Sequence, residues 1–363
     1  MSISIDARLS PAVGEYAGDR TVFARRMLLA LAIVLVLTAM FSVASGATDT
    51  SVVSVAWALL SGQDDLISAV ERVVILDIRM PRTLLGMLIG AALAVSGATM
   101  QGLFRNPLAD PGIVGVSAGA SLGAVTFIVL GAGALAPVAA FLGMYHIPFA
   151  AFAGGLLFTM ALYRISTRNG RTSVATMLLA GIALGAMAGA FTGLLVFWAD
   201  DEQLRDLTFW GLGSIAGATW VKVMAVAPII IPILVLSPFM ARGLNAMTLG
   251  EATAQHLGIN VQVFKRVAIV MVAAATGACV AVSGGIGFVG IVVPHLLRLL
   301  IGPDHKFLLQ ACALLGAVML LFADAIARQI VAPAELPIGI VTAAIGAPFF
   351  LWILLRRRGL MDI

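Results

Sequence analysis

Apolar runs of about 20 residues recur along almost the whole chain. About 20 apolar residues are needed for one helix to cross a hydrocarbon core of about 30 Å. Membrane β-strands would instead alternate polar and apolar positions over about ten residues. The runs therefore predict an all-α integral membrane protein, with about ten helices near residues 27–43, 82–104, 113–135, 147–165, 175–198, 222–240, 267–284, 286–301, 308–327 and 338–355.

The polar stretch 1–24 precedes the first run and predicts a flexible cytoplasmic tail. A cleaved signal peptide is the alternative, because Arg25 and Arg26 precede an apolar run that ends in small residues. The polar stretch is long for a signal peptide, and the run is long enough to span, so we expect a retained helix. The remaining chain then forms a single transmembrane domain, 25–358, followed by a cytoplasmic end, 359–363.

The lysines and arginines predict the orientation. An even number of helices puts both termini on one side, and cytoplasmic segments of membrane proteins are enriched in these residues. With the termini inside, 16 of the 22 lysines and arginines fall in inside segments. We therefore expect cytoplasmic N- and C-termini, and the net charge of +4 reflects orientation rather than a nucleic-acid partner.

Three connections are long. Residues 45–81 are expected outside, with an amphipathic stretch from Asp64 to Asp77 on the membrane surface, and 199–221 form a second external segment. Residues 241–266 form the only long loop expected in the cytoplasm.

A short internal repeat is visible. Gly112–Val116 and Gly287–Ile291 have similar sequences 175 positions apart, and five predicted helices separate them. An odd number of helices would make the two halves face opposite ways, as in transporters with inverted repeats. A match of five residues in a glycine-rich chain also arises by chance.

Composition limits the chemistry. The chain is 61% hydrophobic and 11% charged, and none of its three lysines follows a glycine. A phosphate-binding loop ends in Gly-Lys-Ser/Thr, so this chain carries no such ATPase site. Its two cysteines, Cys279 and Cys312, both fall in apolar runs and predict neither a disulfide framework nor a clustered metal site.

Ionisable residues are scarce within the predicted spans. Such residues usually mark a proton or ion route. Asp324 and Arg328 lie four positions apart near the outer end of the ninth helix, a spacing that predicts a local ion pair. This pattern disfavours an ion-coupled carrier. We therefore expect another chain to supply the energy for transport.

The four histidines share no metal-ligand spacing, and the sequence shows no hydrolytic triad. These observations disfavour a metal site and a membrane-embedded enzyme. The histidines are His146, His256, His295 and His305.

Glycines recur every four residues along two predicted helices, on one face of each. Such a face lets another backbone approach closely, and tight helix packing is one interpretation. The other is that a smooth face lines a pathway for a large solute. The glycines are Gly115, Gly119 and Gly123 in the third helix and Gly181, Gly185, Gly189 and Gly193 in the fifth.

The cytoplasmic loop contains helix-forming residues between two glycines, from Leu249 to Gly258. Glycine typically ends a helix, so the pattern predicts short helices separated by turns. Small residues on the surface would permit docking into a groove of another subunit. A compact loop of this length suggests a partner.

Two arginines occur where the second helix is expected to open at the outer face. Pro81 suits a first helical turn, and Arg79 and Arg82 project to the same side. Outer arginines run against the usual charge bias and require anionic partners. Lipid phosphates and acidic residues of a docking protein both fit.

Four motifs occur in order along the chain, namely Arg79–Arg82, Gln101–Pro111, Gly285–Gly290 with Pro294 and His295, and Glu335–Gly339. Together they resemble the permeases of bacterial ABC importers for cobalamin, iron-siderophores and haem. The resemblance covers about residues 79–355.

The resemblance implies a homodimer in the bacterial inner membrane, with the pathway at the subunit interface. It also implies two cytoplasmic ATPase subunits, which hold ATP and Mg, and a periplasmic substrate-binding protein. Arg79 and Arg82, and Arg328 as a third position, match external arginines that receive acidic residues of the binding protein. The loop matches the segment that couples to the ATPase, with Leu249, Gly250, Glu251, Ala254, Leu257 and Gly258 as its candidate residues. Glu251→Arg or Leu257→Arg would then disrupt assembly without unfolding the chain.

Two short segments, Arg168–Val174 and Gln203–Trp210, look most like the haem-uptake branch. The implied function is import of haem, with a ferric siderophore or cobalamin as alternative cargoes of the same machinery. His295 belongs to a motif shared with non-haem members, which argues against an iron ligand. Recognition of the cargo is expected in the binding protein.

Overall fold

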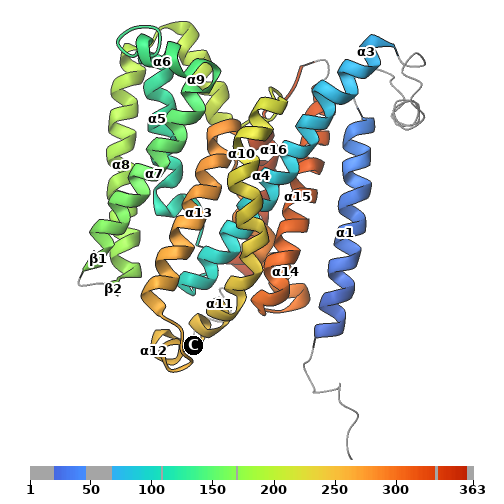
Figure 1. Ribbon diagram of the computed structural model, residues 1–363, viewed down its shortest axis with the longest axis vertical. Coiled ribbons are helices and arrows are strands. Elements are labelled where there is room, and N and C mark those ends of the chain that lie inside the picture. Colours follow the sequence, from blue (N-terminus) through green and yellow to red (C-terminus); the bar gives the residue numbers. More distant parts are fainter. Residues whose placement is uncertain (1–19, 46–67, 108, 169–170, 332–333, 358–363) are drawn as a thin grey trace, which may run out of the picture.

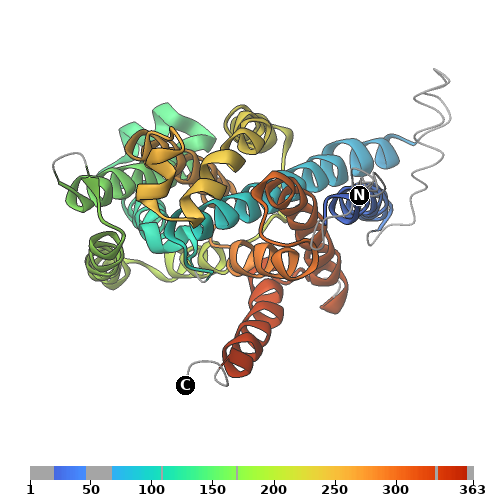
Figure 2. The same ribbon diagram turned by 90° about the horizontal axis from the view of Figure 1, so that it is seen from below.

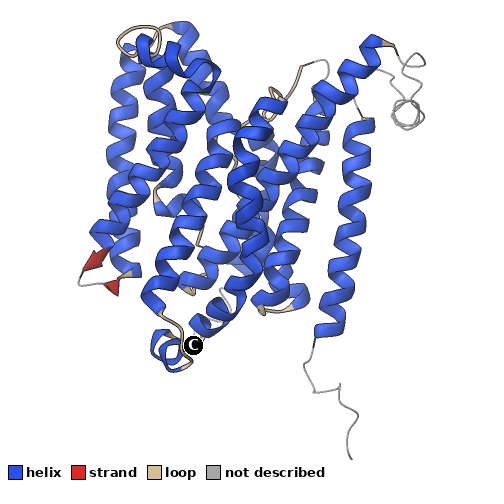
Figure 3. Cartoon of the chain, viewed as in Figure 1, coloured by secondary structure: helices blue, strands red, loops and turns tan. Residues whose placement is uncertain are grey.

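Helices form nearly all of the chain in the computed structural model, which describes residues 20–45, 68–107, 109–168, 171–331 and 334–357 (Figure 3). One antiparallel hairpin interrupts them, in which β1 (Thr167–Arg168) pairs with β2 (Arg171–Thr172). The helices are α1 Thr21–Ala44, α3 Ala69–Arg72, α4 Met80–Phe104, α5 Val116–Leu130, α6 Ala136–Leu142, α7 His146–Ser166, α8 Val174–Trp198, α9 Asp201–Leu212, α10 Trp220–Leu236, α11 Ala241–Thr248, α12 Glu251–His256, α13 Val261–Ser283, α14 Val289–Ile301, α15 His305–Ile330 and α16 Ile338–Arg357.

Ten helical segments carry the predicted apolar runs. Seven of them are long and apolar enough to cross a membrane, and three are shorter apolar helices, Val116–Leu130, Val289–Ile301 and Ile338–Leu351. This arrangement confirms the predicted all-α transmembrane class. The seven longer segments are Thr21–Ala44, Ala69–Phe104, Ala136–Ser166, Ala175–Trp198, Trp220–Thr248, Val261–Ser283 and His305–Ile330.

The bundle has two ends that differ in their connections (Figure 1). One end carries α11, α12, the β1–β2 hairpin and the start of α1, and we call it the α12 end. The opposite end carries α3, α6 and α9, and we call it the α9 end. Figure 2 shows the bundle from below, with α1 and α16 at its periphery.

The two copies of the internal repeat lie where α5 and α14 begin. The carbonyl of Val129, near the last residue of α5, accepts a hydrogen bond from Gln203 of α9. The chain leaves α14 toward His305, which binds Asn245 of α11, so α5 and α14 run in opposite directions. These directions agree with an inverted repeat, although the positive φ falls on Gly115 in the first copy and on Phe288 in the second.

Helix α4 lies at the centre of the bundle and packs against α10, α13, α14 and α15. Its backbone approaches α15 at Gly90 and α14 at Gly97 so closely that a methyl group there would overlap the carbonyl oxygens of Gly316 and Gly290. Lipid tails are as apolar as the side chains, so close packing of small residues contributes much of the association between membrane helices.

The second membrane helix is longer than predicted. It begins at Ala69, where Ser68 and Glu71 form a capping box, and it continues through a π-helical stretch, Val73–Arg79, into α4. Pro81 lies in the first turn of α4, as predicted, but that turn does not open the spanning helix, which already begins at Ala69. The wider π turn, in which the Met80 N–H reaches the carbonyl of Ile75, accommodates a proline inside a helix.

The amphipathic stretch predicted on the membrane surface, Asp64–Asp77, is described only from residue 68 onward. From Ala69 it belongs to the same continuous helix as α4. This part of the stretch is therefore an extension of a spanning helix and not a separate surface segment.

Helix α1 begins at Thr21, three residues before the predicted end of the polar tail. It packs along α15, and its Ser42 hydroxyl lies 2.9 Å from that of Thr83 in α4. Residues 1–19 and 358–363 lie outside the part of the chain that the structure describes.

Candidate functional site

The loop between α10 and α13 folds into two short helices, α11 and α12. Gly250 and Gly258 adopt φ values of +104° and +83°, a conformation that side chains with a Cβ rarely adopt. Each glycine thus breaks the helix at its position, which confirms the predicted pattern of short helices separated by glycine turns.

The predicted coupling residues of this loop divide into two groups. Leu249 and Leu257 are 65% and 52% exposed. Ala254 is fully buried, and the carboxylate of Glu251 turns toward α13. Only the leucines therefore offer an apolar surface to a partner.

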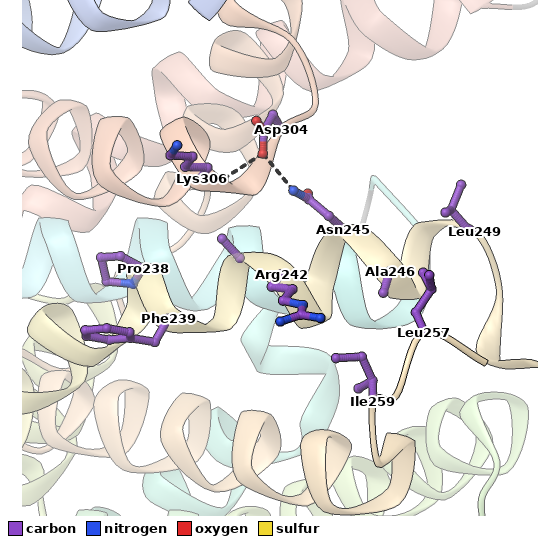
Figure 4. Close-up of a pocket in the computed structure, with 11 residues that line it drawn as sticks. Pro238, Phe239, Arg242, Asn245, Ala246, Leu249, Leu257, Ile259, Asp304 and Lys306 are labelled. Carbon is purple, nitrogen blue, oxygen red and sulfur yellow. Dashed lines mark hydrogen bonds between the residues drawn. The ribbon is translucent and has the colours of Figure 1, made fainter. Parts of the chain in front are cut away.

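A groove of about 640 Å³ lies beside these leucines (Figure 4). It is lined by residues of α11, of the α12–α13 connection and of the start of α15. Phe239 at its edge is 80% exposed. An exposed apolar rim around a concave surface is typical of a docking site.

Asn245 of α11 connects the loop to α15. Its Nδ2 donates to Asp304 Oδ1 at 2.7 Å, and its Oδ1 accepts from the backbone N–H of His305 at 3.0 Å. The Nδ1 of His305 lies 2.8 Å from the same oxygen. The asparagine therefore binds the first turn of α15, where backbone N–H groups lack helical partners.

Lys265 of α13 connects the loop to the β1–β2 hairpin. Its side chain is only 3% exposed, and its Nζ lies 2.6 Å from Glu251 Oε1 and 3.1 Å from the carbonyl of Thr172. The carboxylate of Glu251 therefore balances a buried charge within the chain, in addition to the coupling role predicted for this residue.

A cluster of charged residues lies at the α9 end. Arg82 donates to both oxygens of Asp324, with its Nη2 2.9 Å from Oδ1, and its Nη1 lies 2.8 Å from Glu335 Oε1. Arg328 Nε lies 3.1 Å from Asp324 Oδ2, which confirms the predicted ion pair. Asp324 is 1% exposed and sits between the two guanidinium groups.

The last turn of α1 supplies the other partners of this cluster. Arg79 donates to the carbonyls of Val43 and Ala44 at 3.1 and 3.0 Å, and Arg328 donates to that of Ser45 at 2.8 Å. Carbonyls at a helix C-terminus lack helical partners and attract cations. The three arginines predicted to bind a docking protein thus come together but point into the bundle, with Arg79 5% and Arg82 7% exposed.

The two glycine faces differ. On α5, a methyl group at Gly119 or Gly123 would overlap backbone atoms of α7, so this face packs tightly. On α8, added methyl groups at Gly185, Gly189 and Gly193 would meet nothing within 4 Å. Gly181, the first of that series, is buried. Packing within the chain therefore explains the glycines of α5 but not those at 185, 189 and 193.

Two of the sequence motifs meet where the last turn of α4 contacts the first turn of α14. Gln101 donates to the carbonyl of Gly290 at 3.1 Å and accepts from Arg298. Asp110 caps the turn that follows, accepting from the N–H of Gly112 at 2.8 Å. Burial raises the pKa of Asp110 above its usual range.

The histidines have different partners in the fold. His146 and His256 bind carbonyls of their own segments, His295 faces Phe349 with ring centroids 6.3 Å apart, and His305 binds Asn245. Among the described residues, no group of three histidines, cysteines and acids could hold a metal ion.

Comparison with known proteins agrees with this geometry. The chain is 47% identical over 283 residues to the hemin transport system permease protein HmuU of Yersinia pestis, covering 78% of this chain and 83% of that protein. It is 42% identical over 292 residues to the vitamin B12 import system permease protein BtuC of Salmonella typhimurium, covering 80% and 86%.

Solved structures include the same fold. A protein described as a metal-chelate type ABC transporter in an inward-facing conformation superposes with a TM-score of 0.80 at 31% identity, over 92% of this chain and 99% of that one. The profile of the FecCD transport family matches residues 33–356, which is nearly the whole described bundle. The chain belongs to the FecCD transport family.

Proposed function

We propose that the chain is the transmembrane permease subunit of an ATP-driven importer that moves haem from periplasm to cytoplasm by alternating access. The observation that carries the choice of cargo is the 47% identity with a hemin permease across most of both chains. The chain itself supplies the membrane path and no site for nucleotide hydrolysis.

The α12 end faces the cytoplasm in this proposal. The start of α1, α11 and the hairpin all lie at this end, and they carry five arginines, namely Arg25, Arg26, Arg168, Arg171 and Arg242. Cytoplasmic segments favour such residues, and the inner membrane of a bacterium is the location that fits the haem and vitamin B12 relatives.

The two ATPase subunits dock at the groove beside α11 and α12. Exposed Leu249, Leu257 and Phe239 supply an apolar surface there, and the inward residues Asn245 and Glu251 attach the loop to α15 and α13. A partner that moves the leucines therefore moves helices that are bonded to the same loop.

A second copy of the chain completes the pathway. The glycine face of α8 at positions 185, 189 and 193 has no covering side chains in the described chain. A smooth helical face open to its surroundings suits either close contact with a second copy or passage of a large planar solute such as haem.

The periplasmic binding protein docks at the α9 end. The charged cluster holds the guanidinium groups of Arg79, Arg82 and Arg328 but only two carboxylates, so it carries a surplus positive charge. The side chain of Glu335 is 41% exposed, so the cluster opens to the surface there, and an acidic group of the binding protein would compete with this carboxylate for Arg82. Such charge pairs chiefly set orientation and encounter rate.

Cobalamin is the second candidate cargo, since relatives named as vitamin B12 permeases are 42% identical over a similar length. Reconstitution of the permease with its ATPase and binding protein in proteoliposomes separates the cargoes. We expect ATP-dependent uptake of haem and little uptake of cobalamin or a ferric siderophore. Preferential uptake of cobalamin would reassign the cargo.

A further inference from the structure

A buried lysine connects the docking loop to the helix with the open glycine face. Lys265 lies in the second turn of α13, and its ammonium group is almost fully enclosed by protein. Removing such a charge from water is costly unless hydrogen-bond partners replace the solvent. Its two partners are therefore expected to hold fixed positions relative to each other.

The first partner belongs to the docking loop. Glu251 is the first residue of α12, and its Oε1 lies 2.6 Å from Lys265 Nζ. The exposed leucines on either side of α12, Leu249 and Leu257, are two and six positions away along the chain. A displacement of this short helix would move the Glu251 carboxylate relative to Lys265.

The second partner belongs to the connection into α8. Thr172 ends β2, and the next residue, Ser173, caps α8 by accepting from the N–H of Thr176. The Thr172 carbonyl accepts from Lys265 at 3.1 Å, and its N–H donates to Gln262 Oε1 at 3.2 Å. Both backbone polar groups of Thr172 are thus held by α13.

The start of α8 is therefore attached to α12 through one side chain. Figure 1 shows the hairpin, α12 and the start of α13 at the same end of the bundle. Along its length α8 packs on α5 and α7, while its glycines at 185, 189 and 193 face open space. A helix covered on one side only can shift when its first residues are pulled.

We propose that Lys265 is a positioning residue that transmits movement of α12 to α8, and so links ATP hydrolysis on the partner to opening of the transport path. This inference rests on the proposed function, in which the ATPase docks at α11 and α12. Glu251 passes the movement of α12 to Lys265, and Lys265 passes it to the start of α8 through the Thr172 carbonyl.

The test measures haem imported per ATP hydrolysed, in proteoliposomes that contain the full complex of permease, ATPase and binding protein. Lys265→Met removes both bonds while keeping an unbranched side chain. We expect the ratio to fall by about fivefold or more, with co-purification of the ATPase retained. Lys265→Arg, which keeps the charge and the donors, restores most of the ratio.

Arg266→Met is the matched control. Arg266 is the neighbouring residue, and its Nε donates to Tyr163 of α7 at 3.1 Å without contacting α12. Its loss should leave the ratio unchanged. Glu251→Gln provides a second test if Lys265→Met does not fold, because this residue is partly exposed and the amide keeps its shape. The double variant with Lys265→Met and Glu251→Gln should import no less haem per ATP hydrolysed than Lys265→Met alone.

A wild-type ratio in both Lys265→Met and Glu251→Gln would overturn the proposal. Equal losses in Arg266→Met would also overturn it, since they would assign the effect to general loosening of α13. Failure of the wild-type complex to use ATP for haem uptake would instead reject the proposed function itself.

Discussion

The carboxylate of Asp324 lies 2.9 Å from the Nη2 of Arg82, although 242 positions separate the two residues in the chain. The carboxylate also faces Arg328 and is almost fully buried. This pair joins α4 to α15 at the α9 end, next to the last turn of α1.

Asp324→Asn should therefore destabilise the bundle strongly. It removes the carboxylate that pairs with both Arg82 and Arg328 and leaves Glu335, the partner of Arg82, as the one carboxylate of the cluster. Breaking a buried ion pair by removing one partner typically costs about 3–5 kcal/mol. Glu335→Gln is the control, since this more exposed partner of the same arginine should cost less than about 1 kcal/mol. Thermal unfolding in detergent compares them, and similar midpoints for the two variants would contradict the assignment.

Leu257→Arg should abolish co-purification of the ATPase while leaving the thermal midpoint of the permease unchanged, because the leucine is exposed and touches the docking groove. Ala254→Arg, at a buried position of the same loop, should lower both the midpoint and the co-purification. Undiminished assembly in Leu257→Arg would place the ATPase elsewhere.

The two glycine faces predict opposite responses to a single methyl group. Gly123→Ala should lower the thermal midpoint by the equivalent of about 1–3 kcal/mol, because the methyl group would overlap the carbonyl of Ala150. Gly189→Ala should leave the midpoint unchanged or raise it, since the space is open and alanine favours a helix.

A bulkier residue at the same open position tests the pathway. Gly189→Leu should reduce haem uptake while the permease still folds and binds the ATPase. Normal uptake by this variant would show that the glycine face of α8 does not line the pathway.

Asp110→Asn should change how stability depends on pH. Burial raises the pKa of the Asp110 carboxyl, so the folded chain holds this proton more tightly than the unfolded chain. Folding stability from this group then falls as the pH rises through the raised pKa. The amide removes that cost and still accepts from Gly112. The thermal midpoint of the variant should gain on that of the wild type as the pH rises above about 4, the ordinary pKa of an aspartate, and a difference that does not change with pH would contradict this prediction.

The helices could be predicted from the sequence because apolar length is a local property. All ten predicted runs have a corresponding helix. The extension of the second helix to Ala69 could not be predicted, because a proline such as Pro81 normally marks a helix start, whereas here a π-helical stretch precedes it and leads directly into α4.

Side-chain partners were less predictable, since they depend on contacts between distant segments. Asp324 and Arg328 form the predicted pair because they are four positions apart on one helix. Arg82 and Lys265 meet carboxylates from other elements, and no local pattern points to those contacts. For Lys265, the one available signal in the sequence is its position at the edge of an apolar run.

The central claim is that ATP hydrolysis drives the import of haem. Uptake of haem by proteoliposomes that contain permease, ATPase and binding protein tests this claim most directly. Accumulation should require ATP inside the vesicles and should persist when a protonophore collapses the proton gradient. Uptake that continues without nucleotide and stops when the gradient is collapsed would contradict it.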